Sequence, residues 1–312
     1  MDTAVEFKVL VCDHISEKGL SMMKDAGLDV DYRPKITPEE LLAVADGYDA
    51  IVVRSRTKVR ADVINRASRL KVIGRAGVGL DNIDVEAAKA KGVAVYNSPE
   101  SLTNAVAELT LGLMIAVARG VGAGHHGLKN GAWVKESLMG TELTGKTIGI
   151  VGFGRIGRRL AELLKPFSVS ILAYDVIQPD QLTLDALGVR MAPLEEVLSS
   201  SDFVSLHLPG GVSMKGFIGP QQLELMKSSA FLVNTSRGEV IDEDALVNAL
   251  KSSALRGAAL DVYSVEPPTN KELLALGNVV LTPHVGGQTS EAQDSASTIV
   301  AKKIIEHLSK SR

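Results

Sequence analysis

Cysteine is nearly absent from this chain, and its scarcity excludes one class of protein. The 312 residues contain a single cysteine, Cys12, so an internal disulfide framework is excluded and a reducing compartment is favoured. Cys12 closes an apolar run beside Asp13. We therefore expect a small buried side chain there rather than a reactive thiol.

The chain also lacks a strong charge of either sign and a long hydrophobic run. Its net charge is -3 and its pI about 6.1, which gives no electrostatic reason for a nucleic-acid partner. The longest apolar stretch, 105–118, is interrupted by Glu108 and is too short to span a bilayer. A signal peptide begins with a basic segment and continues with an apolar one, whereas this part of the chain contains the acidic residues Asp2 and Glu6. We expect a cytoplasmic protein with no signal peptide and no membrane partner.

The chain does contain a regular alternation of short apolar runs and amphipathic segments. Strands are predicted at 8–11, 50–53, 71–74, 93–96, 147–151, 170–174, 203–206, 230–234, 257–260 and 279–282. Helices are predicted at 16–26, 62–67, 84–91, 105–119, 158–165 and 290–308, with a loose glycine-rich loop at 120–131. Because the strands are apolar on both faces, we expect α/β architecture with parallel sheets covered by helices on each side.

A glycine-rich turn, Gly152-Phe153-Gly154-Arg155-Ile156-Gly157, joins a predicted strand to a predicted helix. The first glycine permits the tight turn, the second lets the backbone approach a pyrophosphate, and the third lets helix and strand pack closely. The helix N-terminus then favours the anion. The next strand ends at Asp175, eighteen residues beyond Gly157, where a carboxylate accepts hydrogen bonds from ribose hydroxyls and repels a 2′-phosphate. The pattern predicts NAD rather than NADP.

Two prolines, Pro99 and Pro283, bracket the second strand and helix series. We expect residues 99–282 to form a Rossmann NAD-binding domain. It would be inserted into a flavodoxin-like substrate-binding domain made of residues 1–98 and 283–312. Both domains would be doubly wound parallel sheets, and two chain crossings would make a hinge with the ligand between them.

Polar residues follow four successive strands of the second series. His207, Arg237, Asp261 with Glu266 close behind, and His284 all come after apolar runs. Ligands of open α/β sheets lie beyond the carboxyl ends of the strands. Each residue alone reads as a surface turn or a capped strand end, but together they predict a catalytic site at one edge of the sheet.

These motifs resemble those of the D-isomer-specific 2-hydroxy-acid dehydrogenases, in that family's order and over essentially the whole chain. The matching segments are VRSRT (53–57), GRAGVGLDNID (74–84), GFGRIG (152–157), NTSRG (234–238), AALDV (258–262), EPP (266–268) and TPHVGG (282–287). Segments 75–84 and 139–143 look most like the D-3-phosphoglycerate dehydrogenase branch, in a short form. We expect no regulatory extension after Arg312, and no serine feedback through one.

The resemblance implies NAD-dependent oxidation of a 2-hydroxy acid with three catalytic residues. His284 would be the acid/base, since a histidine titrates near neutrality; Glu266 would fix its tautomer; and Arg237 would hold the substrate carboxylate with a two-pronged donor. The residues expected to bind the cofactor are Gly152, Gly154, Arg155, Ile156, Gly157, Asp175, His207, Pro209, Thr235, Ser236, Arg237, Asp261, His284, Gly286 and Gly287. Asp261 would lie near the nicotinamide carboxamide.

The expected substrate contacts are spread over both domains: Arg54, Ser55, Gly77, Val78, Gly79, Lys135, Arg237 and His284. In phosphoglycerate dehydrogenases several basic residues follow the tryptophan of the inter-subunit arm, whereas here Lys135 stands beside Glu136. A glyoxylate or hydroxypyruvate reductase therefore stays open, as does a non-catalytic NAD(H)-sensing corepressor-like protein. The apolar helix at 105–118 and the arm that follows it favour a homodimer. His125 and His126 lack further ligands, so we expect no metal.

Overall fold

The computed structural model describes residues 7–310 and divides into two compact units. Unit 1 comprises 1–102 and 287–312, and unit 2 comprises 103–286. Two sequence expectations, about a leader and about an extension after Arg312, rest on residues outside the described range.

The unit boundaries fall four residues later than the two bracketing prolines, at both crossings. Hydrogen bonds account for the difference. The Ser101 hydroxyl donates to the carbonyl oxygen of Ser98, which keeps the first crossing with unit 1. The N–H groups of Val285 and Gly286 donate to the Asp261 carboxylate, which keeps the second crossing with unit 2.

Unit 1 is built on a five-stranded sheet in the order β2-β1-β3-β4-β5, with every pairing parallel. This is the flavodoxin-like order. Its strands are β1 (Lys8–Val11), β2 (Asp29–Tyr32), β3 (Ala50–Val53), β4 (Val72–Arg75) and β5 (Ala94–Asn97). Its helices are α1 (Glu17–Asp25), α2 (Pro38–Val44), α3 (Ala61–Arg66), α4 (Val85–Ala90) and α13 (Ser290–Ser309), with the 3-10 turn η1 (Ala45–Gly47).

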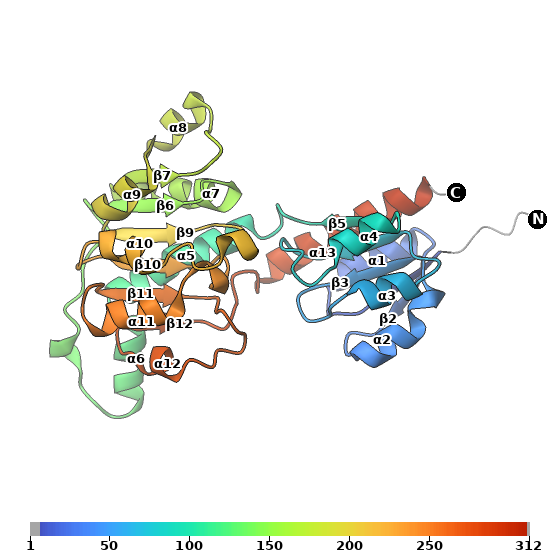
Figure 1. Cartoon of the computed structure of the whole chain (residues 1–312), viewed down its shortest axis with the longest axis horizontal. Helices are drawn as coiled ribbons and strands as arrows, with labels where there is room; N and C mark the ends of the chain where they lie inside the picture. Colours follow the sequence, from blue (N-terminus) through green and yellow to red (C-terminus); the bar gives the residue numbers. More distant parts are fainter. Residues whose placement is uncertain (1–6, 311–312) are drawn as a thin grey trace, which may run out of the picture. The chain divides into compact units, whose positions relative to one another are not determined.

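Helices cover both faces of the unit 1 sheet (Figure 1). Helices α2, α3 and α4 contribute to one buried apolar cluster, and α1 and α13 contribute to the other. Helix α13 packs very closely at two glycines. A Cβ added to Gly19 would lie 2.7 Å from the Ser297 Cβ, and one added to Gly74 would lie 2.5 Å from the Val300 Cγ1. The chain's last helix is thereby tied to its first sheet.

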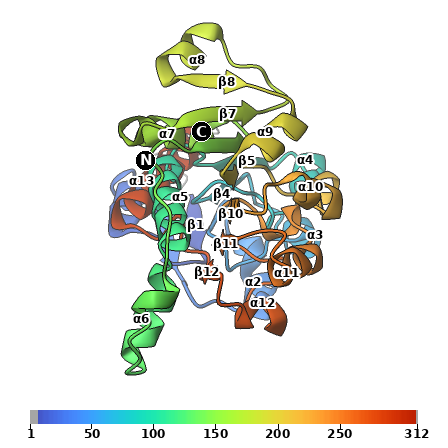
Figure 2. The ribbon, with the colours of Figure 1, turned by 90° about the vertical axis from the view of Figure 1, so that its left-hand side faces the viewer.

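Unit 2 is built on a seven-stranded, all-parallel sheet in the order β12-β11-β10-β9-β6-β7-β8, which contains the Rossmann order. Its strands are β6 (Thr147–Val151), β7 (Ser170–Tyr174), β8 (Val189–Met191), β9 (Phe203–Leu206), β10 (Phe231–Asn234), β11 (Gly257–Leu260) and β12 (Val279–Leu281). Figures 1 and 2 show this sheet from two sides. The sheets therefore confirm the expected fold class of two doubly wound α/β domains.

The helices of unit 2 also form two layers. Helices α5 (Thr103–Ala118), α7 (Arg155–Leu164) and α8 (Gln181–Leu187) share one apolar cluster. Helices α9 (Leu194–Ser200), α10 (Pro220–Leu225), α11 (Glu243–Lys251) and α12 (Lys271–Ala275) share the other. The remaining elements are α6 (Val121–Lys129) and the 3-10 turns η2 (Lys135–Ser137), η3 (Lys165–Phe167), η4 (Val212–Met214) and η5 (Gly238–Val240). Helices thus cover both faces of the unit 2 sheet.

The expected loop at 120–131 is wrong, because most of it forms helix α6. Figure 2 shows α6 continuing beyond α5, away from the sheet. Its glycines serve close packing rather than flexibility: a Cβ added to Gly127 would lie 2.7 Å from the Val134 Cγ2. Two strands, β2 and β8, and six helices, α2, α8, α9, α10, α11 and α12, were not predicted from the sequence. Strands β2 and β8 stand at sheet edges, where a partly exposed strand lacks the continuous apolar run of a central one.

No single helix in the described range is long and apolar enough to cross a membrane. Helices α5 and α6 taken together have the length and apolar composition of a membrane span, but they are bent by 66° where they meet. Half of the residues of α5 are buried within unit 2.

Candidate active site

The glycine turn of unit 2 has the geometry expected of a pyrophosphate cradle. Gly152 has a φ of +95°, and a Cβ there would lie 2.4 Å from the carbonyl oxygen of His207. A Cβ on Gly157 would lie 2.5 Å from the carbonyl oxygen of Gly152. Gly154 is different, since a Cβ there would meet no described atom within 4 Å. Two glycines are required by the protein's own packing, and the third leaves open space beside the N-terminus of α7, where an anion is favoured.

Asp175 follows β7 and reaches back to this turn. Its Oδ2 accepts the N–H of Phe153 at 2.6 Å, and its Oδ1 accepts the N–H of Ile177 at 2.9 Å. Each carboxylate oxygen has a second lone pair, so the ribose hydroxyls of a dinucleotide still find acceptors there. The carboxylate thus holds the turn and presents a negative charge beside it.

His207 follows β9 and carries an unsatisfied polar atom. Its Nε2 lies 2.9 Å from the Ser205 hydroxyl, whereas its buried Nδ1 has no hydrogen-bond partner among the described residues. Burial lowers the pKa of His207 to about 4, so the ring is neutral at physiological pH. A buried orphan nitrogen next to the glycine turn fits a site that a polar ligand completes.

His284 and Glu266 form a direct pair. The Nδ1 of His284 lies 2.8 Å from one carboxylate oxygen of Glu266 and 3.0 Å from the other. A carboxylate only accepts, so Nδ1 must carry the proton, and the neutral ring keeps its lone pair on Nε2. Both side chains are nearly half exposed. The free nitrogen therefore belongs to a histidine that solvent or a ligand can reach.

The backbone of His284 is held in an uncommon conformation. Its φ is +53°, in the left-handed region, which costs a non-glycine residue of order 1–3 kcal/mol. The buried carboxylate of Asp261 fixes this turn by accepting three hydrogen bonds: from Val285 N–H at 2.8 Å, from Gly286 N–H at 2.8 Å and from the Thr282 hydroxyl at 2.6 Å. Asp261 therefore fixes the backbone of the turn that carries His284.

Arg237 lies on a loop fixed by Asn234, the last residue of β10. The buried Asn234 side chain donates to the carbonyl oxygen of Arg237 at 2.9 Å and accepts from the N–H and the hydroxyl of Ser236. Arg237 Nη1 donates to the carbonyl oxygen of Ser236 at 2.7 Å. A Cβ on Gly238 would lie 1.8 Å from the carbonyl carbon of Tyr263, so the arginine loop rests directly on the backbone that leads to Glu266.

Tyr263 supports the turn that carries His284 as well. Its hydroxyl donates to the carbonyl oxygen of Thr282 at 2.9 Å, and its N–H donates to Glu266 at 3.3 Å. Burial, and then the charges of Asp261 and Glu266, raise the pKa of Tyr263 to about 12. The phenol stays protonated and keeps donating, so the loops that carry Arg237, Glu266 and His284 form one connected structure.

In unit 1, the expected substrate residues follow β3 and β4. Arg54 and Ser55 come after β3, and 77–79 come after β4. The Gly77 N–H donates to the buried Ser98 hydroxyl at 2.8 Å, while Asn97 donates to the carbonyl oxygen of Val78. Burial lowers the pKa of the Arg54 guanidinium, against the opposing effect of Asp13. Both segments thus lie at the carboxyl end of the unit 1 sheet.

Other expected site residues lie outside the loops described above or contact another part of the chain. Lys135 is exposed in η2, beyond α6, and Gly287 falls in unit 1. Pro209 is exposed, and the buried Thr235 hydroxyl lies 2.8 Å from that of Thr110 on α5. His125 and His126 lie on α6, and no described cluster of three or more His, Cys, Asp or Glu residues has the geometry to hold a metal.

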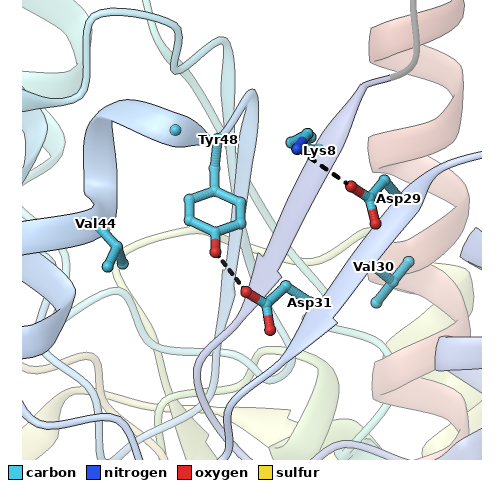
Figure 3. Close-up of a pocket in the computed structure, with 7 residues that line it drawn as sticks. Lys8, Asp29, Val30, Asp31, Val44 and Tyr48 are labelled. Atoms are coloured by element: carbon cyan, nitrogen blue, oxygen red, sulfur yellow. Dashed lines mark hydrogen bonds and ion pairs between the residues drawn. The ribbon is translucent and has the colours of Figure 1, made fainter.

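A pocket in unit 1, shown in Figure 3, contains none of these residues. It lies at the amino ends of β1 and β3, opposite the loops just described. Its polar side chains are paired with one another: Lys8 with Asp29 at 3.6 Å, and the Tyr48 hydroxyl with Asp31. The pocket therefore offers no unpaired charge to a ligand.

The geometry of unit 2 agrees with a family relationship. Residues 111–286, more than half of the chain, match the family model described as "D-isomer specific 2-hydroxyacid dehydrogenase, NAD binding domain". The chain belongs to this family. Unit 2 is its NAD-binding domain, which confirms the expected cofactor.

The similarity of this chain to known proteins extends over both units. It is 45% identical to a D-3-phosphoglycerate dehydrogenase of Methanocaldococcus jannaschii and 39% identical to that of Homo sapiens, over 95% and 96% of its length. The chain spans only 56% of each of these proteins. Among solved structures, TT0316 protein from Thermus thermophilus has a TM-score of 0.89 at 36% identity, covering 97% of both chains. A glyoxylate reductase from Paecilomyes thermophila has a TM-score of 0.91 at 28% identity, covering 99% of this chain and 97% of that one.

The residues that hold the loops of the candidate site were not predicted from the sequence. Asn234 and Gly238 were noted only as parts of a motif, although one fixes the Arg237 loop and the other gives it room. In unit 1, Asp13 and Asn82 were assigned no role. A buried polar residue inside an apolar run is a usable signal, because it must find partners.

Proposed function

We propose that this chain acts as an NAD-dependent D-3-phosphoglycerate dehydrogenase. It would oxidise 3-phospho-D-glycerate to 3-phosphohydroxypyruvate, a reaction of serine biosynthesis. The observation that carries the proposal is the pair formed by His284 Nδ1 and Glu266 at 2.8 Å. The curated relatives named above support the choice of substrate.

In this proposal, His284 moves the proton. NAD bound at the glycine turn of unit 2 supplies the chemistry of hydride transfer. His284 Nε2 takes the proton of the substrate hydroxyl in the oxidative direction and returns it in the reductive direction. Glu266 stabilises the imidazolium that forms and keeps the ring in the tautomer that leaves Nε2 free.

Arg237 would bind the substrate carboxylate. A planar guanidinium matches the two oxygens of a carboxylate better than an ammonium does. Its charge also polarises the keto oxygen during reduction. The contact between Gly238 and Tyr263 supports this role, because it keeps the arginine loop in a fixed relation to Glu266.

The phosphate group of the substrate would be bound by cationic side chains that lie outside the glycine turn. Arg54 of unit 1 and Lys135 of the arm are the proposed contacts, together with Ser55 and the backbone N–H groups of 77–79. Burial of the Arg54 guanidinium favours this role, because an incompletely solvated charge gains more from an anionic partner.

Oxidation of NADH by the purified chain tests the function directly. Phosphohydroxypyruvate, hydroxypyruvate and glyoxylate are assayed in parallel. We expect kcat/KM to be highest with phosphohydroxypyruvate, because only this acid carries the phosphate. Turnover with none of the three would contradict the dehydrogenase proposal and favour an NAD(H)-sensing protein without activity.

A glyoxylate or hydroxypyruvate reductase is the second candidate, and two observations favour it. The arm presents Lys135 beside Glu136, so its local charge is balanced. The fold matches a glyoxylate reductase with a TM-score of 0.91. Equal or higher kcat/KM with the unphosphorylated acids would select this function.

We further propose a cytoplasmic homodimer that buries the arm. Four large apolar side chains on α6 and the segment around η2 are exposed: Val121, Leu128, Trp133 and Met139. Trp133 is 80% exposed. Exposed apolar side chains that lie together on a surface are typical of an interface with another protein. A monomer in sedimentation at micromolar concentration would contradict the assembly.

A further inference from the structure

Asp13 is a buried carboxylate at the carboxyl end of β1, and the proposed reaction does not use it. Only 2% of the residue is exposed. Its Oδ2 accepts the N–H of Arg54 at 2.6 Å and the N–H of Thr57 at 3.2 Å, and its Oδ1 accepts the Thr57 hydroxyl at 2.7 Å. One side chain therefore holds both ends of the loop 54–57.

Asn82 holds the same loop by hydrogen bonds to the loop's carbonyl groups. Its buried side-chain amide donates to the carbonyl oxygen of Arg54 at 2.8 Å and to that of Thr57 at 2.6 Å. Asp13 and Asn82 thus bind the N–H and C=O groups of the same two residues. The backbone conformation of this loop is fixed by two side chains that come from distant parts of the sequence.

The loop carries two arginines with different surroundings. Arg56 is fully engaged: its Nε pairs with Asp13 at 3.1 Å, and its other nitrogens donate to the carbonyl oxygens of Cys12, Pro34 and Ile36. The Arg54 guanidinium makes one long hydrogen bond in the described range, 3.4 Å to the carbonyl oxygen of His14. Arg56 therefore belongs to the framework of the loop, whereas most N–H donors of the Arg54 guanidinium have no hydrogen-bond partner among the described residues.

We propose that Asp13 and Asn82 are positioning residues that aim the Arg54 guanidinium at the substrate anion. The inference rests on the proposed function, in which Arg54 contacts the acid. Because the backbone of the loop is already fixed in the free protein, ordering it costs no entropy when the substrate binds. The clamp acts through Arg54 and touches neither the proton nor the hydride that moves.

Asp13→Asn is the test. The amide would turn an N–H₂ group toward one set of loop donors, so at least one of the hydrogen bonds to Arg54 or Thr57 is lost. We expect the KM for the preferred keto acid to rise about tenfold, which corresponds to one lost interaction of ordinary strength. The kcat and the Kd for NADH should stay within about twofold of wild type, because unit 2 is untouched.

Asp49→Asn is the matched control. Asp49 is a second buried aspartate of unit 1, 4% exposed, that accepts the N–H of Lys8 at 2.9 Å and pairs with Arg69 at 2.8 Å. It stands before β3, at the opposite end of the sheet from Arg54. We expect both variants to lower the Tm, and only Asp13→Asn to raise the KM.

A double variant checks that Asp13 acts through Arg54. Arg54→Gln alone should raise the KM, and adding Asp13→Asn to it should change the KM by no more than about twofold, since coupled residues are not additive. An unchanged KM in Asp13→Asn, or a KM raised equally in Asp49→Asn, would overturn the positioning role. Absence of turnover in the wild-type chain would overturn the proposed function together with it, so the two failures are distinguishable.

Discussion

Asp261 in unit 2 and Asp13 in unit 1 each accept hydrogen bonds from two main-chain N–H groups and one threonine hydroxyl, and Asp13 pairs with Arg56 as well. Each is buried, and each follows a strand of its sheet. The loop held by Asp261 carries His284, whose ring is paired with Glu266 in the same unit. The loop held by Asp13 carries Arg54, which makes only a long hydrogen bond to a carbonyl oxygen.

The difference between the two loops indicates a division of work, in which one loop serves proton transfer and the other serves substrate binding. Unit 2 presents a histidine whose ring is hydrogen-bonded to a carboxylate of the same unit, which suits the proton transfer proposed for it. Unit 1 presents a cation without an acidic side chain bonded to its guanidinium among the described residues, so it is equipped for binding an anion. Changes at the first loop should therefore lower kcat, and changes at the second should raise KM.

The largest effect is expected for His284→Asn. Asparagine has no group that exchanges a proton near neutral pH, so kcat should fall about a thousandfold, as for loss of a general acid/base. The Kd for NADH, followed by fluorescence titration, should change little. Glu266→Gln serves as the graded control with a smaller loss, because an amide still accepts a hydrogen bond but does not stabilise the imidazolium. Near-normal turnover in His284→Asn would remove the division of work altogether.

A smaller effect is expected for Asp261→Asn, the counterpart of Asp13→Asn. The amide cannot accept from Thr282, Val285 and Gly286 at once, so the left-handed turn at His284 relaxes. We expect kcat to fall about tenfold with the KM for the acid nearly unchanged, in contrast to Asp13→Asn. A weakened affinity for NADH with normal kcat would instead support the contact with the nicotinamide carboxamide implied by the family resemblance.

Much of the fold was predictable because buried parallel strands have a strong sequence signal. The strands at 147–151 and 170–174 were predicted to the residue, and both have interiors made of apolar runs. Strand β2 was missed because two of its four residues are aspartates and it lies at the edge of the sheet. Helix α6 was missed because its glycines signal a loop, whereas their function is to let the arm pack closely.

The candidate site was also predictable from the sequence only in part. The family, the fold class and NAD were predicted from motifs and are confirmed, whereas the roles of Arg237, Glu266 and His284 stay predictions with supporting geometry. The supports Asp13 and Asn82 were not found, because each acts on loop atoms far away in the sequence; Asp13 and Arg54 are 41 residues apart. Hydrogen bonds to main-chain atoms leave no mark on the partner's residue type, so periodicity and motifs do not reveal them.

A further prediction concerns the stability of the chain in acid. Burial lowers the pKa of His207 in unit 2 from 6.5 to about 4, so the folded state binds this proton later than the unfolded state does. The stability that comes from the neutral ring is complete above pH 6.5 and is lost progressively as the pH falls toward 4, by at most about 3 kcal/mol. His207→Gln cannot be protonated in this range and should lose less stability than wild type between pH 7 and pH 5, measured by urea unfolding. His14→Gln, which replaces an exposed histidine of unit 1, should keep the wild-type slope. If wild type and His207→Gln lost stability in parallel, the unpartnered Nδ1 would have to be hydrated rather than buried, and its place in a ligand site next to the glycine turn would be lost with it.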